Sequence, residues 1–264
     1  MKKHFSVLYQ LVFIVFIFSL VLSSCVPQKK IKYLQKKQKE DTTSLYGNKR
    51  TIDYKIQPKD NIYIRIFSLD EKTFMFFNKQ STGGGYNDYA NDASIYLNSY
   101  SVTSEGYIEF PIVGKVYVKD LTVEQVKDVL QQLINEYLNE TTVVVKMVNF
   151  NITIVGEVAR PGQYKIYQDE ITIFEAFSMA GDLTDFANRK KVALIRATKG
   201  GSKVYYLDLN SDKILTSEFY YLMPGDIIYI SPLGIKQWGF ASFPWAVVFT
   251  AISTALLLIN YFKF

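Results

Sequence analysis

The chain has 264 residues, with 30 Lys and Arg residues against 25 Asp and Glu residues, which gives a formal net charge of +5. This excess of positive charge is too small to indicate a nucleic-acid partner. Cys25 is the only cysteine, so an internal disulfide framework is excluded and the fold has to be held by its core. The 20 Tyr and 19 Phe residues favour β-sheets.

Residues 1–24 have the layout of a secretory signal peptide. Lys2 and Lys3 form a basic head, and an apolar segment follows from Leu11 to Leu22. This segment is shorter than the roughly 20 residues that a spanning helix needs, which disfavours the alternative of an uncleaved membrane anchor. The expected cleavage motif consists of Leu22, Ser23 and Ser24.

Cys25 follows this motif directly, and the arrangement resembles the bacterial lipobox, in which the cysteine is lipidated and becomes the first residue of the mature protein. The alternative of a buried thiol is disfavoured, because Cys25 lies beside Pro27 and a lysine-rich stretch. Val26 follows Cys25 where an Asp would resemble an inner-membrane retention signal, so we expect the lipid anchor to lie in the outer membrane. The next residues lack the acidic pair that resembles a surface-export signal in some bacteria, so we expect the folded domains to lie in the periplasm.

We interpret residues 25–50 as a lipidated linker, because they are polar and charged. The basic residues of the linker either form a solvated surface or contact acidic lipid head groups at the membrane. They are Lys29, Lys30, Lys32, Lys36, Lys37 and Lys39.

Cleavage of the signal peptide would leave 240 residues (264 minus 24), without His4, the only histidine. This length suffices for two small domains. Ser-His-Asp triads, Cys-His nucleophiles and histidine-based zinc sites are then excluded. The carboxylate pairs Glu105/Glu109 and Asp182/Asp185 are explained as turn, strand-surface or cap residues. We therefore expect no enzyme, and we assign no catalytic residue, metal site or cofactor.

The sequence predicts a first α+β domain over residues 51–149. Isoleucines alternate with other residues from Ile62 to Ile66, as in a half-buried strand. Three consecutive glycines at 83–85 favour a mobile loop, and strands are expected around Gly106 and Gly114. A capping box at Thr122 opens a helix to about residue 138, and a strand follows at 142–148. The apolar face of this helix consists of Val123, Val126, Val129, Leu130, Leu133, Ile134, Tyr137 and Leu138.

A second domain is predicted over residues 150–233. It begins with a strand at 152–158 and a turn at Arg160-Pro161-Gly162. A second capping box at Thr172 opens a helix that Gly181 ends. Further strands are expected at 192–197, 203–207 and 226–230.

Residues 237–262 form a stretch without charge, and we predict a C-terminal transmembrane helix there. The alternative is a buried C-terminal helix of a soluble domain. One stripe of this segment is mildly polar, which indicates either a helix–helix contact or a water-filled lumen enclosed by several copies. The pore-lining candidates are Thr250, Ser253 and Asn260.

Four stretches of this chain resemble the polysaccharide export family of outer-membrane capsule and exopolysaccharide translocons. They are residues 53–62 (DYKIQPKDNI), 104–116 (SEGYIEFPIVGKV), 121–124 (LTVE) and 154–164 (IVGEVARPGQY). The fourth resembles the opening of an SLBB domain, a β-grasp module, and residues 223–230 (MPGDIIYI) resemble its end. The motif residues that the resemblance singles out as structural are Gly156, Pro161, Gly162 and Gly181.

The resemblance implies an α+β fold in which an export domain precedes the SLBB domain and a C-terminal transmembrane helix. It also implies a ring-shaped homo-oligomer that is lipid-anchored in the outer membrane and lets a polysaccharide pass without covalent chemistry. An inner-membrane partner of the polysaccharide co-polymerase or tyrosine-kinase type would supply the driving energy. The alternative is a periplasmic scaffold lipoprotein, or adaptor, of a polysaccharide assembly complex.

Two positions depart from the family pattern. Lys59 stands where the export domain usually has Gly, so we expect a different turn there. Asp182 replaces the second Gly of an Ala-Gly-Gly ending. Only one SLBB-like unit is recognised, which implies a short periplasmic body.

Overall fold

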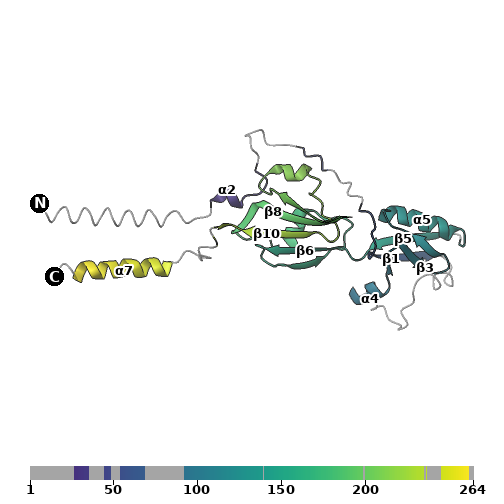
Figure 1. Ribbon diagram of the computed structural model, residues 1–264, viewed down its shortest axis with the longest axis horizontal. Helices are drawn as coiled ribbons and strands as arrows, with labels where there is room; N and C mark the ends of the chain where they lie inside the picture. The colour runs from purple at the N-terminus through teal and green to yellow at the C-terminus, as the bar shows by residue number, and fades with distance from the viewer. Residues whose placement is uncertain are drawn as a thin grey trace.

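The computed structural model describes two α+β domains that follow one another along the long axis of the molecule (Figure 1). The predicted signal peptide, Cys25 and the triple-glycine segment lie outside the described residues. The described residues are 27–35, 45–48, 54–68, 92–138, 140–198, 200–234, 236 and 245–261.

The first domain is built on a three-stranded antiparallel sheet with β1 in its centre. Ile62, Ile64 and Ile66 point into the core, because successive side chains of a strand alternate between the two faces. The predicted half-buried strand is therefore confirmed. The strands of this sheet, in order, are β2 (Tyr100–Ser101), β1 (Asn61–Ser68) and β5 (Thr141–Met147).

A hairpin of β3 (Tyr107–Phe110) and β4 (Gly114–Tyr117) adds a second small sheet to this domain. Its buried side chains Ile108, Phe110 and Val116 join the same core as the isoleucines of β1. A short helix, α4 (Asp92–Leu97), precedes β2.

Helix α5 (Val123–Asn135) begins with the predicted capping box, in which Thr122 and Gln125 bond each other's backbone N–H groups. It buries Val126, Leu130 and Ile134 against the sheet. The predicted apolar face wrongly includes Tyr137, which is 55% exposed because the helix ends at Asn135. Leu133 is only partly buried.

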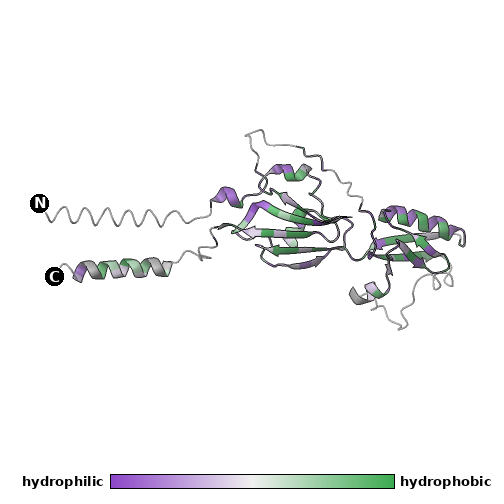
Figure 2. Ribbon diagram, viewed as in Figure 1, coloured by the Kyte–Doolittle hydropathy of each residue, from purple (hydrophilic) through white to green (hydrophobic). Residues whose placement is uncertain are grey.

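The second domain contains a five-stranded mixed sheet in the order β7-β6-β10-β8-β9. The neighbours β6 and β10 are parallel, and the other pairs are antiparallel. Figure 2 shows hydrophobic residues along these strands. The strands are β6 (Asn151–Gly156), β7 (Gly162–Lys165), β8 (Ala187–Thr198), β9 (Gly201–Leu207) and β10 (Ile227–Pro232).

Helix α6 (Ile173–Met179) packs against this sheet through Ile173, Ala176 and Phe177. Its capping box between Thr172 and Glu175 is also present as predicted. A 3-10 helix, η1 (Asp212–Thr216), follows β9 and adds Ile214 to the core. The mixed content of helices and strands confirms the predicted α+β class.

The prediction of a linker over residues 25–50 is wrong for the segment 27–35. Helix α2 (Gln28–Ile31) lies against β8 of the second domain, and the residues after it pack on the core of that domain. Charged residues dominate the composition of this segment, whereas the packing of Tyr33 on the second-domain core decides where it lies.

Among the described residues, no helix is both long enough and apolar enough to cross a membrane. The C-terminal helix α7 (Trp245–Tyr261) has 17 residues, and residues 237–244 and 262 lie outside the described part. The predicted transmembrane helix over residues 237–262 is therefore not found.

The burial pattern of α5 separates two neighbouring leucines by their expected effect on stability. Leu130 is fully buried, so Leu130→Ala should lower the free energy of unfolding by about 2–5 kcal/mol. Leu133→Ala removes the same atoms from a partly exposed position and should cost about 1–2 kcal/mol. Urea unfolding of both variants measures the difference, and equal losses would mean that α5 faces its sheet differently.

Candidate functional site: the interdomain cleft and the second-domain motif

Gly156 allows two backbones to approach each other at the end of β6. Its φ is +100°, and a Cβ atom placed there would lie 2.0 Å from the carbonyl oxygen of Ile230. Glu157 N–H donates to the same oxygen at 3.0 Å. Only glycine accepts both this φ and this contact. Gly156 is thus a structural requirement of the parallel pair of β6 and β10.

The turn after β6 packs against the end of α6. Ala159 N–H donates to the Asp182 carbonyl at 3.0 Å, and Arg160 N–H donates to the Ala180 carbonyl at 2.9 Å. Gly181 has φ +75° and lies beside the Arg160 side chain, so it ends the helix as predicted. Pro161 is exposed in the turn, and Gly162 has open space around it.

The closing motif of the second domain holds a buried ion pair that the sequence did not reveal. The Arg196 guanidinium donates to both carboxylate oxygens of Asp226, at 2.9 and 2.7 Å. Met223 N–H donates to Asp226 as well, at 2.8 Å, and Asp226 is 1% exposed. Breaking such a bidentate buried pair leaves an uncompensated charge. This pair therefore fixes the turn before β10 rather than serving a ligand.

A hydrogen-bonded network around Asp60 connects the first domain to the start of the second. The buried Asp60 carboxylate accepts from the Tyr54 hydroxyl at 2.9 Å and from the Asn149 amide at 3.2 Å. Burial and then the nearby negative charge of Asp60 raise the pKa of Tyr54 far above its usual value. Lys59 has φ +77°, so this lysine adopts the left-handed conformation that favours glycine.

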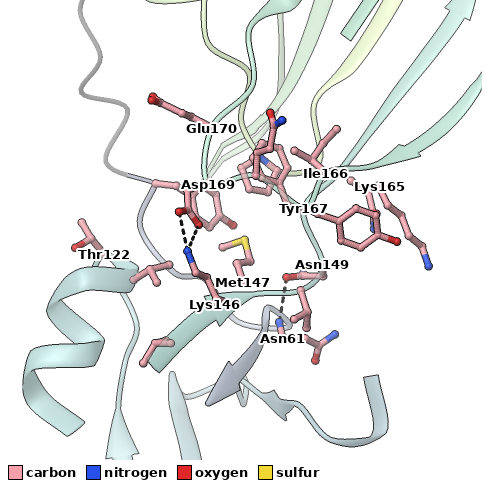
Figure 3. Close-up of a pocket in the computed structure, with 18 of the residues that line it drawn as sticks. Asn61, Thr122, Lys146, Met147, Asn149, Lys165, Ile166, Tyr167, Asp169 and Glu170 are labelled. Atoms are coloured by element: carbon pink, nitrogen blue, oxygen red, sulfur yellow. Dashed lines mark hydrogen bonds and ion pairs between the residues drawn. The ribbon is translucent and has the colours of Figure 1, made fainter. Parts of the chain in front are cut away.

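A cleft of about 820 Å³ lies between the two domains (Figure 3). Across it, the Lys146 ammonium of β5 contacts the Asp169 carboxylate of the second domain at 2.7 Å. At its base, Asn61 N–H donates to the Asn149 side-chain oxygen at 3.2 Å. The sequence could not reveal this cleft, because its walls come from segments that lie far apart along the chain.

Polar, charged and aromatic side chains line the cleft, and they could bind a ligand. Tyr96 and Tyr167 offer exposed aromatic rings, and Asn151 and Gln168 offer amide groups. No described group of three or more His, Cys, Asp or Glu residues could hold a metal ion. Asp169 is paired with Lys146, and Glu124 and Glu170 also line the cleft, so it offers hydrogen bonds, ring contacts and charged groups to a ligand.

The pore-lining candidates lie on α7 and do not meet in a cavity of the single chain. Thr250 donates to the Ala246 carbonyl at 2.7 Å, and Ser253 donates to the Phe249 carbonyl at 2.7 Å. These hydroxyl groups are therefore satisfied within their own helix. Asn260 is exposed. The predicted lipidation site Cys25 and its cleavage motif at residues 22–24 lie outside the described residues.

Gly156 and Gly162 of the second-domain motif differ in what a side chain would meet, which gives a matched pair of variants. Gly156→Ala forces a clash with the Ile230 carbonyl at an unfavourable φ, so it should lower the free energy of unfolding by about 3 kcal/mol. Gly162→Ala meets open space and should change it by less than about 1 kcal/mol. Thermal or urea unfolding compares them; a tolerated Gly156→Ala would contradict the close approach of β6 and β10.

The architecture has counterparts among known proteins. A family model described as polysaccharide biosynthesis/export protein matches residues 48–148, and an SLBB domain model matches residues 151–207. The EPS I polysaccharide export outer membrane protein EpsA of Ralstonia solanacearum is 28% identical over 186 residues, which are 68% of this chain and 48% of the relative. The EpsA protein of Ralstonia nicotianae is 26% identical over 153 residues, 57% of this chain and 39% of the relative.

The chain thus spans half or less of the length of these relatives. The two matched models nevertheless follow each other without overlap and cover the three described sheets, apart from strand β10 of the five-stranded sheet. By this succession of domains, residues 48–148 belong to the polysaccharide export family and residues 151–207 form an SLBB domain.

Proposed function

We propose that the chain is an outer-membrane component of exopolysaccharide or capsule export. The observation that carries this proposal is that an export domain precedes an SLBB domain in this chain. The similarity of the chain to EpsA proteins supports it. Proteins of this family are transport components, so the chain is not an enzyme. The polymer would pass through an assembly of copies without covalent chemistry.

Attachment to the outer membrane would come from a lipid on Cys25, with both domains in the periplasm. The lipobox-like motif supports the lipid, and the names of the relatives support the membrane. A partner of the polysaccharide co-polymerase or tyrosine-kinase type in the inner membrane would deliver the polymer. No nucleic acid and no cofactor belong to this function.

A single helix cannot enclose a polymer, so a channel would require several copies of the chain to assemble into a ring. Helix α7 supports it, because large apolar side chains stay exposed there in the single chain, among them Phe249, Ile252 and Leu256. Neighbouring copies or lipid would have to cover them. Thr250, Ser253 and Asn260 would then face the lumen, where water and the polymer pass.

A scaffold lipoprotein is the second candidate function, and one observation favours it. The hydroxyl groups of Thr250 and Ser253 are bonded within α7. Hydroxyl groups that are hydrogen-bonded within their own helix do not require water as a partner, so α7 could pack on another envelope protein instead of lining a lumen.

Lipidation and export are tested together by Cys25→Ser. Without the thiol no lipid can be attached, so the variant should yield an unlipidated precursor of higher peptide mass. Polysaccharide in the medium should fall to the level of a deletion strain. Intact-mass spectrometry, fatty-acid labelling and total-sugar determination measure these outcomes. Normal fatty-acid labelling would refute the lipidation site, and unchanged polymer in the deletion strain would refute the export function.

Single cysteines on α7 distinguish the channel from the scaffold. Positions 252, 253, 256 and 260 are all exposed in the single chain. In a ring, cysteine in place of Ser253 or Asn260 should react with a water-soluble maleimide in cells, whereas cysteine in place of Ile252 or Leu256 should be protected. Mass shifts on gels measure the labelling, and equal labelling at all four positions would favour the scaffold.

A further inference from the structure

The segment 27–35, here called the N-terminal clamp, is fixed to the second domain by backbone hydrogen bonds. Leu34 N–H donates to the Leu209 carbonyl at 3.1 Å, and Gln35 N–H donates to the Asn210 carbonyl. The Asn210 amide in turn donates to the Lys29 carbonyl at 3.1 Å. The clamp is therefore held at both its helical start and its extended end.

Tyr33 adds a side-chain anchor to these bonds. Its hydroxyl donates to Asp182 at 2.6 Å, and its ring covers the guanidinium of Arg189 at 5.0 Å. Arg189 is 3% exposed, so removing the ring would open a buried cation to solvent. Burial, followed by the hydrogen bond to Asp182, raises the pKa of the Tyr33 hydroxyl. Edge-to-face contact with Phe174 at 5.8 Å completes the anchor.

The clamp lies at the end of the second domain that is remote from the first domain. Asp182 is bonded to Ala159, just beyond the end of β6, whereas the start of β6 follows the interdomain junction at Asn149. Figure 1 shows α2 and α7 toward the same end of the molecule. Cys25 precedes Pro27 by two residues, which span at most about 7 Å. A lipid on Cys25 would therefore bring this end to the membrane surface.

Three lysines of the clamp, Lys29, Lys30 and Lys32, are exposed at this end. Between described residues, none of these lysines forms an ion pair, and the clamp contains no acidic residue. The neighbouring carboxylates Asp182, Asp208 and Asp212 accept bonds from Tyr33, from the Asn210 backbone and from Tyr46. The lysines are thus the groups left free to meet an outside anion.

We propose that the clamp surface is a membrane-docking surface, on which Lys29, Lys30 and Lys32 bind the phosphate groups of anionic phospholipids. This rests on the lipid at Cys25 that the proposed function includes. The short tether selects lipid head groups over an acidic polymer, because it holds the lysines within reach of the bilayer. Because the clamp is seated on the second domain, binding would orient that domain as well as retain the chain.

Lysine labelling of the full lipidated protein tests the proposal. The protein is reconstituted in vesicles of phosphatidylcholine alone or with 30% phosphatidylglycerol, and acetylation by a water-soluble reagent is followed by mass spectrometry. Lys29, Lys30 and Lys32 should react about threefold more slowly on the anionic vesicles, and 0.5 M NaCl should restore their rate. Lys55, Lys115 and Lys127 of the first domain are exposed internal controls whose rates should not change.

A charge-reversed variant makes the test independent of labelling. Cys25→Ser combined with K29E, K30E and K32E should bind anionic vesicles about tenfold more weakly than Cys25→Ser alone. The matched control carries K55E, K115E and K127E and should bind as the parent does. Equal labelling on both kinds of vesicle, or equal loss in both triple variants, would overturn the proposal. A failure of the proposed lipidation or export would be detected by intact mass and by secreted polymer, so it can be distinguished from a failure of vesicle binding.

Discussion

The parallel pairing of β6 and β10 sets the direction of the whole molecule. Both strands run away from the interdomain junction, so the chain has to leave the second domain at the end opposite the first domain. This pairing depends on Gly156, because its backbone lies against the Ile230 carbonyl with no room for a side chain. Glu157 then bonds to Lys236, which ties the exit of the chain to the same corner. Because Gly156 permits this parallel pairing, the interdomain junction and the exit of the chain toward α7 lie at opposite ends of the second domain.

The junction between the domains is stiffened by polar groups rather than by a shared apolar core. Two separate clusters of buried residues form the two cores, and the bonds between Asp60, Asn149 and Asn61 lie where the chain passes from one to the other. The pair of Lys146 and Asp169 crosses the cleft, but both side chains are more than half exposed. Such a pair contributes little stability, so the cleft is held at its base and adjustable at its mouth.

Local signals in the sequence predicted local structure well. Thr122 and Thr172 were recognisable as helix starts, because a capping box needs only residues three apart. The isoleucines of β1 were recognisable from their alternation. The N-terminal clamp was missed for the opposite reason. Its lysines dominate the composition, whereas the partners of Tyr33 and Leu34, Asp182 and Leu209, lie about 150 and 175 residues away in the sequence. The Arg196–Asp226 pair and the cleft were hidden in the same way.

The C-terminal segment is helical in its described part, where α7 has 17 residues, and the spanning helix predicted from its uncharged composition stays a prediction. The hydroxyl groups of Thr250 and Ser253 in its polar stripe bond within the helix. The structure also shows that the N-terminal clamp is fixed to the second domain through Tyr33, at the same end of the molecule as α7. With the clamp and α7 at one end, the cleft and the export domain lie toward the other. A membrane at the clamp end, as proposed above, would therefore leave the cleft on the side that faces away from this membrane.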